Sequence, residues 1–279
     1  MPSLGESRLD EVRAALSRGG ASGGLRLRTG PYVARIRSPL PEVAESVAKL
    51  YRHLELEGDE PFNPLPGDQG FPLLEWGLNW CVYGLCHQHL TLHSAVLERG
   101  GRALLLPAPS GSGKSTLCAA LLFSGWRLLS DELALIEPRT AALLPIPRPV
   151  SLKNASIEVI RRFAPQVEFG SRVEETAKGV VAHFAPPAAA VRDSHRPAAP
   201  GFIVFPKYTE GAPARLAPLE RSRTFMRLIE HAFNYDIFGH EGFDLLGSLV
   251  DRSACFTFDY GDLAEAVRLF DHLAQGERV

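Results

Sequence analysis

The amino-acid sequence predicts an α/β fold, and three observations indicate it. An apolar strand at 103–106 leads into a loop rich in glycine and serine, and a run of helical composition follows at 117–122. A strand pattern at 91–98 precedes this unit across a short glycine turn. A further strand, at 126–130, follows the helix. Strands that alternate with helices along the chain are typical of the α/β class.

The loop between the strand and the helix has the pattern of a phosphate-binding P-loop. Its residues are Ser110, Gly111, Ser112, Gly113, Lys114, Ser115 and Thr116. The two glycines let backbone N–H groups turn toward phosphate oxygens, and the helix N-terminus adds the positive end of its dipole. Lys114 would reach the β- and γ-phosphates, and the Ser115 hydroxyl would ligate Mg²⁺. Ala108 replaces the first glycine of the usual pattern, so we expect a negative φ there.

The alternative for this loop is a glycine- and serine-rich cap of a helix. A strand directly before the loop and a helix directly after it favour phosphate binding, because this is the context in which P-loops occur. We therefore expect the protein to bind a nucleoside triphosphate or diphosphate. Binding alone does not say what the protein does with it.

Length and composition are those of an ordinary globular protein. The 279 residues suffice for one large domain, or for a small and a medium one. Hydrophobic residues make up 45% and charged residues 22%, and the net charge of −2 provides no bulk attraction to nucleic acid. Four cysteines without a regular framework suit a reducing cytoplasm. Charges throughout residues 1–20 argue against a signal peptide, and no apolar run has the length of a membrane span.

We expect three parts along the chain: a small N-terminal α+β module (1–56), a linker (57–72) and the P-loop domain (73–279). In the module, 9–16 predicts a short helix, 25–38 alternates as strands do, and 42–54 predicts a helix with one apolar face. The linker is rich in glycine, proline, aspartate and asparagine.

The segment 73–90 is apolar on nearly every side and predicts a buried helix. It and the strand behind it contain a set of potential metal ligands: Cys81, Cys86, His87, His89 and His93. Their spacing fits no standard zinc pattern, and no second Cys/His pair follows. Core packing is therefore the favoured interpretation over a metal site.

The strand 126–130 ends in Asp131 and Glu132. An apolar strand that ends in an acidic residue follows the Walker B pattern, in which the carboxylate lies near Mg²⁺ or the nucleophile. The pair comes only one helix and one strand after Lys114, earlier than in ABC-type or RecA-type ATPases. No guanine-reading [NT]KxD motif is present. The alternative is that both residues merely begin a turn.

The rest of the chain predicts further elements and three basic candidates. We expect a hairpin at 133–144, an extended stretch at 145–153, a helix at 156–163, a long loop at 173–196, strands at 202–205 and 255–260, and helices at 221–232, 243–250 and 263–274. Arg148, Lys153 and Lys178 lie in extended or loop segments, where active-site residues tend to occur. They are candidates to contact phosphate or substrate, and solvated surface charge is the alternative for each.

Together, LTLHSAVLE, LLLPAPSGSGKSTL and GWRLLSDE resemble the HPr kinase/phosphorylase family. EWGLNW, RPVSLKN, KGVVAH and AFNYDIFGHEGF are similar to the subgroup of HPr-kinase-related kinase A proteins. The resemblance covers roughly residues 73–270. It implies a P-loop kinase core with a mixed sheet, of the type that HPr kinase shares with phosphoenolpyruvate carboxykinases.

The resemblance also implies roles for individual residues. Asp131 matches the catalytic Asp, His93 the histidine that orients it, and Glu132 takes the place of a second Asp. Lys114 and Ser115 match the phosphate and metal ligands. The loop ends in Lys-Ser-Thr where the family has Lys-Ser-Glu, and the later signature of the phosphorylase step is missing. Neither phosphorylase activity nor HPr as the substrate is therefore carried over.

The sequence thus predicts an enzyme that uses ATP and Mg²⁺ to phosphorylate a hydroxyl, with a Ser of a protein or peptide favoured. One alternative is a small-molecule kinase that acts on an amino acid or sugar. The other is a nucleotide-binding regulator that transfers no phosphate, although pure binding needs no oriented base. We expect a cytoplasmic protein without nucleic-acid or membrane partners. The acceptor, the purine preference and the existence of a homo-oligomer stay open.

Overall fold

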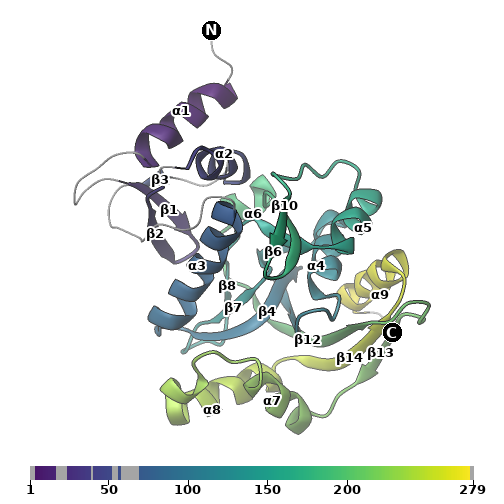
Figure 1. The fold of residues 1–279 in the computed structure, drawn as a ribbon. Coiled ribbons are helices and arrows are strands. Elements are labelled where there is room, and N and C mark those ends of the chain that lie inside the picture. Colours follow the sequence, from purple (N-terminus) through teal and green to yellow (C-terminus); the bar gives the residue numbers. More distant parts are fainter. Residues whose placement is uncertain (1–3, 17–23, 39, 52–55, 58–68, 277–279) are drawn as a thin grey trace.

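A mixed β-sheet with helices on both faces forms the centre of this α/β protein (Figure 1). The structure, a computed structural model, describes residues 4–16, 24–38, 40–51, 56–57 and 69–276. In this part of the chain the central sheet has eight strands, and two smaller sheets have three strands each. The expected α/β class and mixed sheet are confirmed.

The central sheet is built around the hairpin that leads into the glycine loop. Strands β4 (Leu90–Arg99) and β5 (Arg102–Pro107) pair in antiparallel fashion, as expected. β5 pairs in parallel with β12 (Ala199–Tyr208), which pairs in parallel with β14 (Ala254–Tyr260). Parallel strands are buried on both faces, which explains their apolar runs. The remaining strands pair antiparallel: β13 (Arg215–Pro218) with β14, β6 (Arg127–Ser130) and β7 (Leu133–Ile136) with β4, and β8 (Leu143–Leu144) with β7.

Helices cover the two faces of this sheet. On one face, α4 (Lys114–Phe123) and α9 (Leu263–Gln275) enclose an apolar core. On the other face, α7 (Arg221–Ile229) and α8 (Tyr235–Asp251) enclose a second core. The parallel strands β5, β12 and β14 all end at the edge where α4 begins. This edge of the sheet is where ligands bind in α/β folds.

A small antiparallel sheet lies against α4 and corrects one expectation. Its strands are β9 (Val150–Lys153), β10 (Val173–Thr176) and β11 (Gly179–Phe184). The prediction of a long loop at 173–196 is therefore wrong, because this segment contains two strands and the helix α6 (Ala188–Arg192). β11 gains its order from β9, a strand far away in the sequence, and composition alone does not show that pairing. Helix α5 (Ala155–Phe163) follows β9.

The N-terminal module contains a helix pair and a small sheet. Its elements are α1 (Leu4–Leu16), β1 (Leu25–Thr29), β2 (Tyr32–Ile36), α2 (Pro41–Leu50) and β3 (Leu56–Glu57). Of the expected linker, residues 58–68 lie outside the described residues, as do 52–55 of the expected second helix. Residues 70–72 already form the first turn of α3 (Gly70–Leu85). The apolar face of α3 packs into the core of the module, so the helix joins the two parts.

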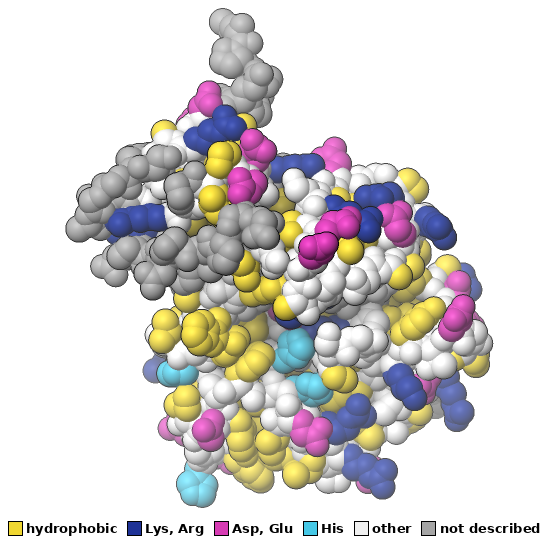
Figure 2. Space-filling model, viewed as in Figure 1, with side chains coloured by type: hydrophobic (Ala, Val, Ile, Leu, Met, Phe, Trp, Pro, Cys, Tyr) yellow, Lys and Arg dark blue, Asp and Glu magenta, His cyan; other side chains and the backbone are white. Residues whose placement is uncertain are grey.

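The expectation that this helix is buried on nearly every side is wrong. Trp80 is 67% exposed and Leu85 is 75% exposed, and Cys81 and Cys86 are only partly buried. One face of α3 packs on the module, and the opposite face is left at the surface (Figure 2). Within the described ranges, no three His, Cys, Asp or Glu side chains form a group that could hold a metal ion. None of the described helices combines the length and apolar character of a membrane span.

Candidate phosphate-binding and catalytic site

The glycine loop contains two backbone positions that favour glycine. Gly111 and Gly113 have φ values of 86° and 87°, in the left-handed region that favours glycine. A side chain at Gly113 would also collide with Tyr260, whose hydroxyl donates to the Gly113 carbonyl at 3.0 Å. Ala108 is not among the described residues with positive φ, as expected. The hydroxyl of Ser112 is buried and has no hydrogen-bond partner among the described residues, so the loop carries a free polar group.

The adjacent strands hold this loop at the sheet edge. The backbone N–H of Tyr208, at the end of β12, donates to the Ser112 carbonyl at 2.9 Å. Lys114, Ser115 and Thr116 form the first turn of α4, which begins directly after Gly113. Backbone N–H groups of a helix start carry partial positive charge. The loop and helix are therefore suited to an anion such as phosphate.

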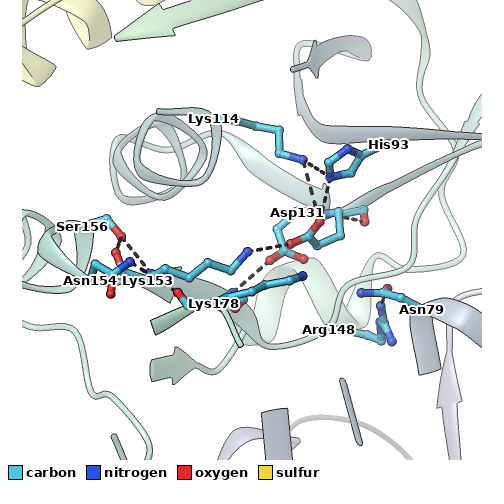
Figure 3. A network of polar contacts seen from close by, with 12 residues as sticks. Asn79, His93, Lys114, Asp131, Arg148, Lys153, Asn154, Ser156 and Lys178 are labelled. Carbon is cyan, nitrogen blue, oxygen red and sulfur yellow. Dashed lines mark hydrogen bonds and ion pairs between the residues drawn. The ribbon is translucent and has the colours of Figure 1, made fainter. Parts of the chain in front are cut away.

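Two strands bring a histidine and a carboxylate to Lys114 (Figure 3). Lys114 is buried, and its Nζ lies 2.8 Å from Nε2 of His93 and 3.8 Å from Oε2 of Glu132. His93 Nε2 lies 3.1 Å from the same Glu132 oxygen. A ring nitrogen carries either a proton or a lone pair, so Nε2 accepts from Lys114 or donates to Glu132, but not both at once. The three side chains can therefore hydrogen-bond in two alternative ways, and a bound ligand can change which of the two is formed.

Glu132 is the anionic centre of this group. Burial alone would raise the pKa of its carboxyl. The hydrogen bond from His93 and the ammonium groups of Lys114 and Lys153 outweigh burial and hold that pKa well below its usual value. Lys153 Nζ lies 3.8 Å from the other carboxylate oxygen. Glu132 is thus ionised at neutral pH and is a weak base.

His93 does not orient Asp131, which corrects the role that the family resemblance implied. The described polar contacts of the His93 ring are with Glu132 and Lys114. Asp131 instead turns toward β9, where its Oδ2 accepts a hydrogen bond from the Ser151 backbone N–H at 2.9 Å. The two neighbouring acidic side chains leave the end of β6 in different directions. Only the tertiary structure shows which of them meets the histidine.

Asp131 has a higher proton affinity than an ordinary aspartate. It is 4% exposed, and burial, followed by the charge of Glu132, raises its pKa to about 6. The Ser151 N–H and the charges of Arg148 and Lys114 partly offset this rise. A carboxyl with such a pKa is largely ionised at pH 7 and still accepts a proton readily.

The three basic candidates separate into two groups. Lys153 approaches Glu132, and the side chain of Lys178 lies beside that of Lys153 (Figure 3). The Lys178 Nζ is 4.6 Å from the centre of the Trp76 ring. Burial lowers the pKa of Lys178, and the positive charges of Lys153 and Lys114 lower it further. Three lysines around one carboxylate leave surplus positive charge. Arg148 is 4% exposed and contacts Asn79 and Glu75 on α3, so surface charge is the wrong interpretation for it.

Several residues at the site were missed from the sequence. The His231 carbonyl accepts from the backbone N–H of His93 at 2.7 Å, and the Phe233 ring centre lies 6.0 Å from that of His93. Burial, followed by the charge of His93, lowers the pKa of His231 to about 4. Asn234 is fully buried and bridges the start of β4 through Thr91 N–H and the His89 carbonyl. Phe233 and Asn234 lie in the phrase AFNYDIFGHEGF, whose similarity to the kinase A subgroup was the available sequence signal for them.

The oxygen donors present fit a magnesium ion that binds together with a nucleotide. Mg²⁺ usually takes one or two protein oxygens and completes its shell with phosphate oxygens and waters. Glu132 supplies an ionised carboxylate, and Ser115 supplies a hydroxyl in the first turn of α4. A site of three or more protein ligands is not needed for this mode of binding.

The site therefore combines a glycine loop at a helix start, a group of lysines and two carboxylates of unequal proton affinity. Such an arrangement is suited to hold a phosphate group beside a proton acceptor. Comparison of this chain with models of known protein families finds no match, and comparison with curated proteins finds none either.

Proposed function

We propose that the protein transfers the γ-phosphoryl group of ATP to a hydroxyl, as a Mg²⁺-dependent kinase of the HPr-kinase-related type. One observation carries this proposal. Lys114, which follows the glycine loop, and Lys153 both approach Glu132, and the neighbouring residue in the chain is the buried Asp131. The resemblance of the loop and of the acidic pair to HPr kinase supports the same function.

The basic groups would hold the triphosphate and neutralise its charge. Backbone N–H groups of the loop and of the start of α4 would face the phosphates, with Lys114, Lys153 and Lys178 around them. Mg²⁺, held by Glu132 and Ser115, would add further neutralisation of the phosphate charge. Because the lysines are already in place, little rearrangement is needed as charge shifts during transfer.

Asp131 would accept the proton of the attacking hydroxyl. A proton acceptor works best when its pKa lies near the working pH, and that of Asp131 is raised to about 6. Glu132 has the opposite tendency, because His93 and the lysines hold its pKa low. We therefore assign Asp131 as the base and Glu132 as the metal ligand.

The surface beside the site supports a protein or peptide acceptor over a free amino acid or sugar. Phe233 is 40% exposed, stacks on Tyr83 at 4.3 Å and lies next to His93. Trp80 on α3 and Ile237 on α8 are exposed by 67% and 56%. Figure 2 shows hydrophobic side chains over both helices, on the face where histidines are visible. Exposed aromatic and aliphatic groups of this kind mark contact surfaces for polypeptides.

The test is phosphoryl transfer from Mg-ATP by the purified full-length chain. The acceptors would be a library of Ser-containing peptides, free serine and simple sugars, with ADP formation and product mass as readouts. We expect a phosphopeptide with wild type and none with Lys114→Ala. A phosphorylated amino acid or sugar would favour the small-molecule kinase. ATP binding without transfer to any acceptor would favour the nucleotide-binding regulator.

A further inference from the structure

A line of buried polar side chains connects the N-terminal module with the candidate site. Tyr51, at the C-terminal end of α2, is fully buried, and its hydroxyl donates to Oε1 of Glu75 on α3. The other Glu75 oxygen, Oε2, lies 3.9 Å from Arg148 Nη1. Arg148 also donates to the Asn79 side chain, one turn further along α3 (Figure 3). Glu75 and Arg148 are each 4% exposed.

Arg148 lies two residues before the start of β9, the strand that contacts the acidic pair. In β9, the Ser151 backbone N–H donates to Asp131, and the Lys153 side chain approaches Glu132. Ser151, whose N–H contacts Asp131, is therefore only three positions after Arg148. A shift of Arg148 would move the start of β9, and with it the hydrogen bond that holds the Asp131 carboxylate.

Burying an arginine and a glutamate costs free energy unless both are paired, and removal of one partner leaves the other charge uncompensated. Burial raises the pKa of Glu75 to about 7, and the negative charge of Asp131 adds to this rise. Arg148 and the hydrogen bond from Tyr51 oppose it. Tyr51 thus favours the ionised form of Glu75, which attracts the Arg148 guanidinium across 3.9 Å. The charged and titratable groups that face Glu75 among the described residues are Tyr51, Arg148 and Asp131.

We propose that the N-terminal module takes part in the reaction indirectly, because Tyr51 and Glu75 hold Arg148 and β9 so that Asp131 is positioned toward the attacking hydroxyl. Tyr51 and Glu75 are positioning residues in this proposal, not catalytic residues. The inference rests on the proposed kinase function for its kinetic consequence. The placement of β9 by Arg148 can be tested without it.

The module offers a matched control in Tyr32. Its hydroxyl lies 2.7 Å from His89 Nδ1, so Tyr32 too connects the module to the segment that follows α3 in the chain. That contact leads to neither Arg148 nor β9. Tyr32→Phe therefore removes a comparable hydrogen bond between the same two parts of the chain, without touching the line through Glu75.

The first experiment compares turnover and Mg-ATP affinity for full-length Tyr51→Phe, Glu75→Gln, the double variant and Tyr32→Phe. We expect Tyr51→Phe and Glu75→Gln to lower kcat by about ten- to a hundredfold, because small displacements of a reacting group have effects of this size. Mg-ATP affinity should stay at the wild-type level. The double variant should be no worse than Glu75→Gln, since both substitutions act through one line. Tyr32→Phe should retain wild-type kcat.

The second experiment follows amide hydrogen exchange of the segment 148–153, which includes the Ser151 N–H that Asp131 accepts. Tyr51→Phe should accelerate exchange there and leave exchange of β5 unchanged, whereas Tyr32→Phe should leave both unchanged. Wild-type exchange at 148–153 in both Tyr51→Phe and Glu75→Gln would overturn the proposal. So would equal kinetic effects of Tyr51→Phe and Tyr32→Phe. If the wild-type chain transfers no phosphate, the kinase assignment fails, and the exchange data alone decide whether the module positions β9.

Discussion

Asp131 and Glu132 are neighbours in the chain, but they lie in two regions with opposite electrostatics. Glu132 faces the glycine loop, where His93, Lys114 and Lys153 surround it and hold its pKa low. Asp131 faces β9, where a single described backbone donor contacts it and burial raises its pKa to about 6. One side of the site thus carries surplus positive charge, and the other side carries a carboxylate ready to take a proton. The surroundings of the two acids, and not their residue type, therefore give their carboxyl groups opposite pKa shifts.

Asp131→Asn should have the strongest effect on turnover. Asparagine keeps the shape and can still accept the Ser151 hydrogen bond, but it takes no proton from a hydroxyl. We expect kcat to fall by about 10²-fold or more, the usual contribution of a positioned acid–base group. Affinity for Mg-ATP, measured by calorimetry, should change little. Wild-type turnover in this variant would refute Asp131 as the base and favour the nucleotide-binding regulator.

Lys114→Ala tests the role of the positive charge beside the glycine loop. Lys114→Ala deletes a buried ammonium group at the proposed phosphate site, and a charge-assisted hydrogen bond contributes about 1.5–3 kcal/mol. Mg-ATP affinity should therefore fall by about tenfold or more. Calorimetry with Mg-ATP measures it. Lys49→Ala, which removes an exposed lysine of α2, serves as the control and should bind like wild type. Equal binding by both variants would contradict the phosphate role of Lys114.

A smaller effect should separate Glu132 from Asp131. Glu132→Gln keeps the length of the side chain but removes the charge that would hold Mg²⁺. We expect the Mg²⁺ concentration needed for half-maximal turnover to rise by about tenfold, whereas Asp131→Asn should leave it unchanged. His93→Ala should raise it by less, because the histidine acts through Glu132. A Mg²⁺ requirement that moves with Asp131→Asn instead would exchange the two roles.

The mildest test uses the pH dependence of stability, for which the two acids have opposite signs. The pKa of Asp131 is raised in the folded state, so its contribution is present at low pH and is lost as pH rises through about 6. The pKa of Glu132 is lowered, so its contribution is present above the ordinary value of 4.5 and is lost as pH falls. At pH 8, Asp131→Asn should therefore raise Tm by a few degrees and Glu132→Gln should lower it by a similar amount. Shifts of equal sign, measured by thermal unfolding at pH 5 and pH 8, would contradict these environments.

Much of the fold and part of the site follow from local sequence. The hairpin β4–β5, the glycine loop and α4 are contiguous, so a strand pattern, two glycines and a helical run suffice to predict them. The same contiguity places His93 beside the loop strand and the acidic pair one strand later. These predictions succeed because each depends on hydrogen bonds and side-chain directions within a short stretch.

Local sequence therefore suffices for the strand, the glycine loop, the helix and the acidic pair one strand later. The tertiary structure decided which acid meets His93, because two consecutive side chains turn opposite ways at the end of β6. It also decided that β11 pairs with β9 and that Arg148 meets α3. These contacts join segments far apart in the chain, and their partners are selected by packing and by the pairing of buried charges, which no local pattern encodes.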